Sequence, residues 1–515
     1  MTVKVIFDEC SVPFWIDIAY RLTKQYDWKP CYWTGDPGFG QQVKQQFPDI
    51  IFHSTLDAIR GLPAKECKDL SLLVLDQPLL EDLAFCELIS LYMMNRIDRI
   101  NAFSFEEREQ LFKQYVRYWS AILKKFIPDV VVFSASPHLV YDYVLYSLCK
   151  RNKIQTILFD QTSLDGWIYP EARFEDGSEL LKKRYHDMVS SWKLGKNKKI
   201  MLTDEAESYL KRVSGDYSGA VPFYMKEQFA QNNITKYIAK KVLSNPKNLS
   251  NIFQKGWHLF SRGHYIKQKR KSIQDSNMKG FEYLWCKAQG MRKKNMLKHH
   301  YQTLQQPAEF HKPYIYFPLH YQPENTSSPL GETFADQFLI VDMLSKCAPA
   351  NWIIYVKEHS SQWHLKLHGE CSRNTDFYDR LVHLPNVKLI PISTPNFELI
   401  DHAKAVVTIT GTSGWEAVIR GKPALVFGHA WYKFCEGVFY IPTENTCRDT
   451  LSKINAGYTV DRELVRLFLS AVQEIGLNAY VEPSYAKIVD ISNEENVSRI
   501  TTAIYTFYLQ STTKK

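Results

Sequence analysis

The chain has 515 residues, of which 45% are hydrophobic and 23% charged, and its formal net charge is +9. This composition is typical of a folded globular protein, and the length predicts two or more domains. The positive charge is spread over a long chain. It allows an anionic ligand or an anionic membrane surface as a partner, and it does not predict nucleic-acid binding. No run approaches the roughly 18 apolar residues needed to span a bilayer.

The chain begins with a segment typical of a β-strand. Residues 2–7 do not show a charged leader followed by an apolar segment and a cleavage site, so we expect a cytoplasmic protein, at most at the inner face of the membrane. The ten cysteines are scattered and form no C-x-x-C pair. They predict buried free thiols in a reducing compartment and argue against a zinc site.

Strand-like segments alternate with helix-like segments over about the first 165 residues. The strand-like segments are 3–8, 29–33, 49–53, 72–75, 129–134 and 155–160. The main helical patterns are 105–126 and 138–151. This alternation predicts βαβ units and an open, parallel, doubly wound sheet.

A region of different character follows, and then the alternation resumes. Residues 170–310 are poor in strand patterns, with helical spacing at 203–212 and 281–304. The basic stretch 262–298 fits either a solvated helical face or a contact with a membrane surface or polyanion. Strands are then predicted at 313–319, 352–357, 386–390, 405–409 and 423–427, helices at 331–345 and 396–402, and an amphipathic helical segment at 462–508.

We therefore expect an α/β protein in which two Rossmann-like domains face a cleft. The expected domains are an acceptor domain (1–170), a helical basic insert (171–310), a nucleotide-sugar-binding domain (311–460) and C-terminal helices that pack back on the N-terminal half (461–515). By fold analogy this is the GT-B arrangement of nucleotide-sugar glycosyltransferases.

The sequence Thr-Gly-Thr-Ser-Gly-Trp-Glu-Ala at 410–417 lies between two strand-like runs. It is expected where a parallel strand turns into a helix that begins near Trp415, and backbone N–H groups at such a turn bind phosphate. The candidate donor-binding residues of this turn are Gly411, Thr412, Ser413 and Gly414. Ser413 and Glu416 also fit a helix capping box, which would need no ligand.

Two other predicted strand ends of the C-terminal half would meet the same crevice. Lys357 and His359 end one strand, on the same side, and a cationic pair at this place suits phosphate. The alternative is an ordinary surface pair. His320 and Gln322 follow another strand, and here the alternative is an ordinary polar loop.

The N-terminal half offers candidates for the catalytic and acceptor groups. Asp160 ends a predicted strand and would face the cleft, where a carboxylate could act as general base or nucleophile. An aspartate that caps a turn is the alternative. His138 could contact acceptor hydroxyls or an acidic sugar, although Pro137 at a first helical turn explains this segment by geometry alone. Glu9 and Cys10 are weaker candidates.

Several familiar motifs are missing from the chain. No D-x-D sequence occurs, so the metal-bridging carboxylates of GT-A transferases are absent, and we expect neither a metal nor a cofactor. A helix N-terminus with Lys357 and His359 would neutralise the leaving phosphate. The absence of G-x-G-x-x-G, G-x-x-x-x-G-K-[ST] and G-x-S-x-G removes support for a dehydrogenase, a P-loop ATPase or an α/β-hydrolase.

Residues from about 313 to 440 resemble the bacterial capsule polysaccharide biosynthesis family, which includes β-Kdo transferases. The resemblance rests on a Phe-Pro-Leu-x-x-Gln-like strand end at 316–322, a Val-Lys-x-His strand end at 355–359, and the block at 410–417 followed by Gly-Lys-Pro at 421–423 and the segment 428–432. The resemblance implies that the phosphate and ribose of a CMP-sugar are bound by His359, Thr412 and Ser413, with Lys357 and Glu416 nearby.

The chain departs from the family pattern at two places. The proline that follows the histidine in the family is Ser360 here. The acidic E-x-G motif of the first half is matched most closely by Asp160 with Asp165 and Gly166, at a different spacing.

The expected function is that of a metal-independent glycosyltransferase in surface polysaccharide assembly. The favoured donor is Kdo or a related acidic sugar on CMP, with UDP- or GDP-sugars as alternatives, and the acceptor is a glycan or a lipid-linked glycan. Two other functions stay open: a sugar-nucleotide epimerase or hydrolase on the same fold, and a non-catalytic scaffold of the polysaccharide machinery.

Overall fold

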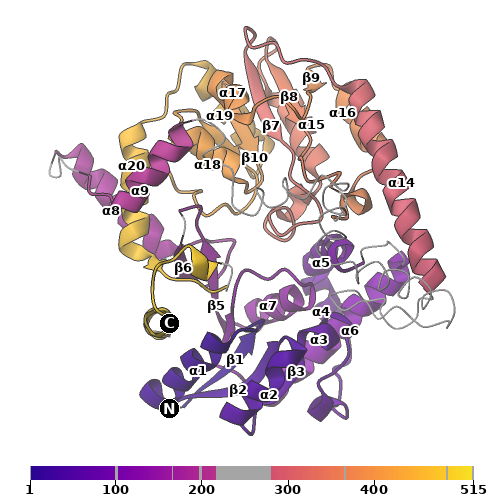
Figure 1. The fold of residues 1–515 in the computed structure, drawn as a ribbon, viewed down its shortest axis with the longest axis vertical. Coiled ribbons are helices and arrows are strands. Elements are labelled where there is room, and N and C mark those ends of the chain that lie inside the picture. Colours follow the sequence, from indigo (N-terminus) through magenta and orange to yellow (C-terminus); the bar gives the residue numbers. More distant parts are fainter. Residues whose placement is uncertain are drawn as a thin grey trace, which may run out of the picture.

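The structure of the protein is a computed structural model, shown in Figure 1. It describes residues 2–98, 103–164, 166–195, 200–215, 280–364, 367–482 and 485–512. These residues form two α/β halves, each built on one sheet, which confirms the α/β class. In Figure 1 the N-terminal half lies below and the C-terminal half above.

The N-terminal half is built on a seven-stranded sheet with the order β13-β6-β5-β4-β1-β2-β3. Its strands are β1 (Val3–Asp8), β2 (Trp28–Gly35), β3 (Ile51–Ser54), β4 (Val130–Phe133), β5 (Gln155–Gln161), β6 (Trp167–Glu171) and β13 (Leu477–Asn478). The strands β1 to β5 are parallel, whereas β6 pairs antiparallel with β5 and β13 antiparallel with β6. Its helices include α1 (Pro13–Tyr26), α2 (Gly40–Gln46), α3 (Thr55–Ile59), α4 (Gln77–Asp82), α5 (Ala84–Ile97), α6 (Phe105–Phe126) and α7 (Tyr141–Arg151).

Alternate residues of β1 enter two separate cores, one on each face of the sheet. Val5 and Phe7 pack with Trp15 of α1, whereas Ile6 belongs to the core formed with α5, α6 and α7. Side chains alternate between the faces of a strand, so a strand covered on both faces is apolar at successive positions. This burial explains the apolar run near the start of the chain.

The C-terminal half is built on a six-stranded parallel sheet with the order β12-β11-β10-β7-β8-β9. Its strands are β7 (Tyr314–Pro318), β8 (Ile353–Lys357), β9 (Val387–Leu389), β10 (Ala405–Thr408), β11 (Ala424–Val426) and β12 (Val438–Tyr440). Its helices include α15 (Gln337–Cys347), α16 (Thr375–His383), α17 (Asn396–His402), α18 (Thr412–Ile419) and α19 (Glu444–Asn455).

Five further helices join or cover the two halves: α8 (Glu179–Lys193), α9 (Asp204–Ser214), α14 (Gly280–Leu304), α20 (Arg462–Ile475) and α21 (Asn493–Thr512). Helix α8 packs on α20, α9 packs on α18, and α21 returns to α1 in the N-terminal half. The first part of the predicted basic stretch, 262–279, lies outside the described residues. Within the described part of the chain, no helix combines the length and the apolar character needed to cross a membrane.

Two predictions of secondary structure are wrong. Residues 72–75 are not a strand: Leu73 and Leu75 pack against the core, while Leu72 and Val74 are 50% and 82% exposed. The strand β3 is the edge of the sheet, and this alternating segment does not pair with it. The segment 462–508 is not one helical stretch, because β13 interrupts it and joins β6 through long-range pairing that local periodicity does not report.

Candidate functional site

The candidate donor site lies where the strand order of the C-terminal sheet reverses. From β7 the chain adds β8 and β9 on one side, and from β10 it adds β11 and β12 on the other, so the reversal falls between β7 and β10. In open α/β sheets, ligands bind outside the carboxyl ends of the strands at such a point. His320 follows β7, and the Gly-Thr-Ser-Gly turn follows β10.

The turn is the first turn of helix α18. The helix begins at Thr412, earlier than the predicted start near Trp415, and Gly411 is its N-cap residue without any side-chain cap. The alternative interpretation, a capping box formed by Ser413 and Glu416, is therefore wrong, because Ser413 already lies inside the helix. Among the residues that the structure describes, no group accepts from the backbone N–H of Thr412 or Ser413. These N–H groups and the helix dipole can bind an anion.

Close packing explains both glycines of the turn. A Cβ atom on Gly411 would lie 2.9 Å from Thr408 Oγ1 and 3.0 Å from His320 Cε1. A Cβ atom on Gly414 would lie 2.5 Å from Tyr432 Oη and 2.8 Å from Thr408 Cγ2. Any larger residue at either position would displace the groups that shape the turn.

His320 joins the ends of β7 and β10. Its Nε2 accepts a 3.1 Å hydrogen bond from the Ile409 N–H and lies 2.8 Å from Thr408 Oγ1, which in turn accepts from the Gly411 N–H. Burial lowers the pKa of His320 to about 3, and the nearby His359 and Arg373 add to this effect. His320 is therefore a neutral group that positions the turn.

Lys357 is buried at the end of β8. Its ammonium donates a 2.8 Å hydrogen bond to the Thr394 carbonyl and a second one to Asn396 Oδ1, and it lies 5.9 Å from the centre of the Tyr316 ring. Burial lowers its pKa to about 7. Its charge therefore depends on pH near neutrality, and these two hydrogen bonds join it to the start of α17.

His359 is half-buried beside Lys357 and Glu358. Its Nδ1 accepts a 3.1 Å hydrogen bond from the Ser361 N–H, which leaves the ring proton on Nε2. Burial lowers the pKa of His359 to about 4. The side chain is thus a neutral Nε2–H donor, suited to a phosphate or ribose oxygen.

Glu416 lies on the inner side of α18. It is buried and accepts a 3.1 Å hydrogen bond from the Thr412 hydroxyl, and burial raises its pKa to about 7.

Gln322 has an internal role: its amide donates a 2.6 Å hydrogen bond to the Ala335 carbonyl, and its Oε1 accepts a hydrogen bond from Arg373.

A buried ion pair that the sequence motifs did not indicate lies below the carboxyl ends of the C-terminal strands. Arg373 Nε donates a 3.0 Å hydrogen bond to Glu358 Oε2. The same oxygen accepts a 2.6 Å hydrogen bond from the Tyr378 hydroxyl. Arg373 also donates to the carbonyl of His320. Arg373 directly follows the short 3-10 helix η4 (Gly369–Ser372) and lies outside the longer helices and strands, so no periodic pattern indicated it.

Asp160 lies where the N-terminal half touches the C-terminal half. Its Oδ2 accepts a 3.1 Å hydrogen bond from the Tyr169 hydroxyl, which lies 3.4 Å from the carbonyl of Trp431. Burial raises the pKa of Asp160 to about 6, while Tyr169 and the cationic Lys433 oppose the increase. Asp165, predicted beside it, lies outside the described residues.

His138 also lies beside a contact between the two halves. Its backbone carbonyl accepts a hydrogen bond from Arg96 of α5, and Arg96 donates another of 2.6 Å to the Ser328 carbonyl of the C-terminal half. The His138 ring Nδ1 lies 3.2 Å from the Ser136 carbonyl.

The N-terminal sheet reverses its strand order between β1 and β4, and Glu9 follows β1 at this point.

Glu9 adopts a left-handed backbone conformation, with φ of 54°, and accepts a 2.9 Å hydrogen bond from the Thr55 hydroxyl. A non-glycine residue held in this region is a feature that often marks functional sites. Within the described residues, no group of three or more His, Cys, Asp or Glu side chains is arranged to hold a metal ion.

Residues 291–440 match the family model described as capsule polysaccharide biosynthesis protein. The matched segment makes up less than a third of the chain. The match confirms the resemblance predicted from the motifs, and it includes β7 to β12 with the candidate donor site. It supports a role in polysaccharide synthesis. No curated protein matches the chain.

Solved structures with distant similarity include an epimerase, a glycosyltransferase and a Kdo transferase. The UDP-GlcNAc 2-epimerase from Neisseria meningitidis is 13% identical, with 99% of this chain and 100% of that chain covered and a TM-score of 0.21. The calicheamicin glycosyltransferase CalG4 is 12% identical, with 97% and 99% covered and a TM-score of 0.25. Thermosulfurimonas dismutans KpsC, a beta Kdo 2,7 transferase, is 12% identical, with 78% and 97% covered and a TM-score of 0.27. At these values the similarity carries no argument about activity.

Proposed function

We propose that the protein is a GT-B glycosyltransferase of surface polysaccharide assembly. The observation that carries the proposal is the uncapped N-terminus of α18 at the strand-order reversal, within the capsule-biosynthesis segment. Its free N–H groups and the Nε2–H of His359 would neutralise the phosphate that leaves with the nucleotide, without a metal. A CMP-activated acidic sugar such as Kdo is the favoured donor.

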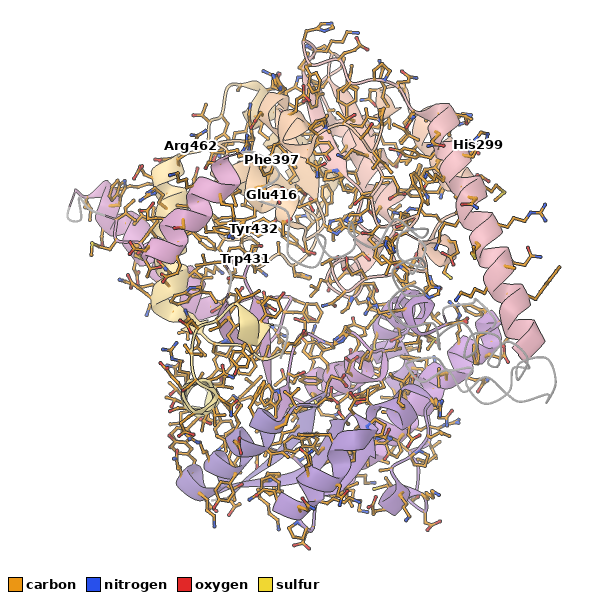
Figure 2. All side chains as sticks on the ribbon, in the orientation of Figure 1. His299, Phe397, Glu416, Trp431, Tyr432 and Arg462 are labelled. Atoms are coloured by element: carbon orange, nitrogen blue, oxygen red, sulfur yellow. The ribbon has the colours of Figure 1, made fainter. Side chains whose placement is uncertain are left out.

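On the opposite side, Asp160 would accept the proton of an acceptor hydroxyl or attack the anomeric carbon. A pKa near 6 lets a carboxylate be ionised at neutral pH and still accept a proton during reaction. The loop after β11 connects the two sides. The Trp431 carbonyl lies 3.4 Å from the Tyr169 hydroxyl, and the Tyr432 hydroxyl donates a hydrogen bond to the Gly411 carbonyl. Figure 2 shows Glu416, Tyr432 and Trp431 following one another from α18 toward the N-terminal half.

Nucleotide binding provides the test. Calorimetry should detect one of CMP, UDP or GDP, and His359→Ala should weaken that binding at least tenfold, because a charge-assisted hydrogen bond is lost (about 1.5–3 kcal/mol). The matched control is His299→Ala, since His299 is exposed on α14, away from α18 (Figure 2). Equal affinities for wild type and the His359 variant would contradict the proposed donor site.

Contact with the inner face of the membrane is part of the same proposal. Exposed Trp285 and exposed Arg292 are seven residues apart and so lie on the same side of helix α14, and an aromatic side chain with a cation on one side of a helix suits an anionic lipid surface. Flotation with vesicles that contain anionic phospholipid should recover the protein, whereas vesicles of zwitterionic lipid should not. Equal recovery with both would contradict this contact.

A further inference from the structure

A polar cavity lies between helix α5 of the N-terminal half and the loops of the C-terminal half. Its volume is about 340 Å³, and it is lined by residues of α5, α14, the loop after β7 and the start of α16. Among the candidate donor residues, only Gln322 lines it. The cavity is therefore distinct from the turn at the start of α18.

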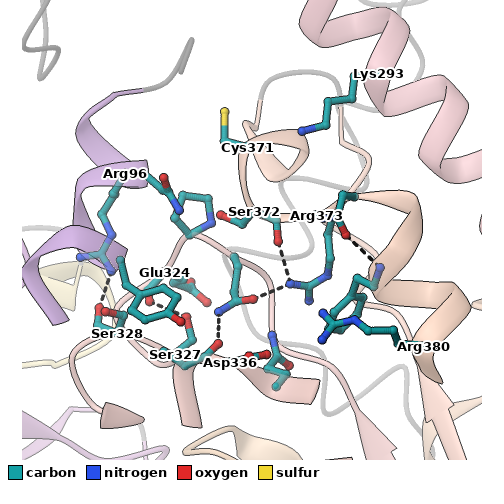
Figure 3. A pocket seen from close by; sticks show the side chains of 18 residues that line it. Arg96, Lys293, Glu324, Ser327, Ser328, Asp336, Cys371, Ser372, Arg373 and Arg380 are labelled. Carbon is teal, nitrogen blue, oxygen red and sulfur yellow. Dashed lines mark hydrogen bonds between the residues drawn. The ribbon is translucent and has the colours of Figure 1, made fainter. Parts of the chain in front are cut away.

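Four cations line this cavity, and they differ in how they are paired with carboxylates. Arg373 and Arg380 form ion pairs with Glu358 and Asp376. In contrast, Arg96 and Lys293 form no ion pair with any of the described residues, and Figure 3 shows Lys293 extending from α14 toward the cavity and Arg96 reaching it from α5.

Two buried polar atoms at the cavity lack a partner among the described residues. Arg96 donates through its two terminal nitrogens to the carbonyls of His138 and Ser328, but its Nε is buried and unpaired. The hydroxyl of Ser328 is also buried and unpaired, on a residue only 5% exposed. Buried polar groups without a partner are costly, so a ligand that satisfied them would be bound favourably.

The two carboxylates on the cavity wall are occupied by contacts of their own. Asp336 accepts a 3.1 Å hydrogen bond from the Phe338 N–H and caps helix α15. Glu324 accepts a 3.0 Å hydrogen bond from the Thr326 hydroxyl, and burial raises its pKa. Glu324 and the buried Asp142 also interact electrostatically with Arg96, so the cationic character of the wall depends mainly on Lys293, which forms no ion pair with a described residue.

We infer that this cavity binds an oxyanion, a phosphate or carboxylate group of the acceptor, through Lys293, Arg96 and the Ser328 hydroxyl. The assignment to the acceptor rests on the proposed function, since a glycosyltransferase must hold a second substrate beside the donor. An ammonium, a guanidinium and a hydroxyl together supply charge-assisted donors for such a group. Because Arg96 contacts both halves, the bound group would also lie at the junction between them.

Calorimetry with sodium phosphate and with glucuronic acid tests the inference and separates the two ligand classes. We expect one of these anions to bind the full-length protein, and Lys293→Gln and Ser328→Ala to weaken that binding, the former by about tenfold. Lys287→Gln is the matched control, because Lys287 is exposed on the same helix and does not line the cavity. No binding of either anion, or an equal loss in the control, would overturn the inference.

Crystals soaked in tungstate, a phosphate analogue, separate this inference from the proposed function. We expect tungstate in the cavity beside Lys293, in addition to any tungstate at the N-terminus of α18. Tungstate at α18 alone would overturn the cavity inference and leave the proposed donor site intact. Tungstate in the cavity alone, without nucleotide binding in calorimetry, would support the cavity and contradict the donor site.

Discussion

The hydroxyl of Tyr432 donates a 2.5 Å hydrogen bond to the backbone carbonyl of Gly411. Tyr432 is fully buried, and its neighbours Trp431 and Lys433 interact with Tyr169 and Asp160 of the N-terminal half. A single loop thus connects the proposed donor-binding turn of one half with the candidate catalytic carboxylate of the other. Changes in this loop are expected to affect both.

Replacing Tyr432 by Phe removes the hydroxyl and leaves the Gly411 carbonyl with only its 3.3 Å contact to the Gly414 N–H. We expect the free energy of unfolding to fall by about 1 kcal/mol, the net value of one buried hydrogen bond, and nucleotide affinity to fall with it. Urea unfolding and calorimetry measure the two effects. Tyr20→Phe is the control, because Tyr20 is 43% exposed; an equal effect there would argue against a specific role for Tyr432.

Gly414→Ala should damage the donor site directly. The added methyl group would lie 2.5 Å from Tyr432 Oη and would force the helix start to shift. Overpacking of this kind costs about 1–3 kcal/mol, so we expect a lower melting temperature and a large loss of nucleotide binding. In contrast, Gly38→Ala has open space around it and should change neither. A Gly414 variant with wild-type affinity would show that the turn does not contact the nucleotide.

Nucleotide affinity should depend on pH through Lys357. A lysine whose pKa is lowered to about 7 is charged below that pH and neutral above it. The nucleotide phosphate is already fully ionised above its second pKa of about 6, so affinity should fall as pH rises from 7 to 9. Lys357→Met should weaken binding at pH 7 and remove this dependence. If affinity changes with pH in the same way for wild type and variant, the charge of Lys357 does not contribute to nucleotide binding.

The rate of sugar transfer should increase as pH rises through about 6, because the carboxyl of Asp160 must lose its proton to act as a base. Asp160→Asn is expected to lower kcat by at least about 100-fold, a typical contribution of general base catalysis, and to abolish this limb of the pH profile. Donor turnover followed over pH 5–8 measures both.

Glu9→Gln is the informative comparison, because Glu9 lies at the strand-order reversal of the N-terminal sheet. If Glu9→Gln loses the activity and Asp160→Asn retains it, the catalytic carboxylate is Glu9. Loss of nucleotide binding in either variant would indicate a structural effect, since neither residue belongs to the C-terminal half.

Several local features could be predicted from the sequence. The strand at Val3–Asp8 and the parallel pairing of β1 to β5 and of the C-terminal sheet were correct, because side chains of a strand buried on both faces are apolar at successive positions. The antiparallel strands β6 and β13 were not predicted. Residues 72–75 show the limit of this reasoning. Their alternation is present in the burial of Leu72 to Leu75, but the segment packs on the core and does not pair with the edge strand β3.

The sequence by itself determined the α/β class and the small-residue turn after β10, since periodicity and glycine placement are local properties of the chain. Only the tertiary structure decided that α18 begins at Thr412, that His320 is a neutral group bound to the end of β10, and that Arg373 pairs with Glu358. These contacts join strands and loops far apart in the chain, and burial then changes the charge of each group. Neither effect can be read from neighbouring residues.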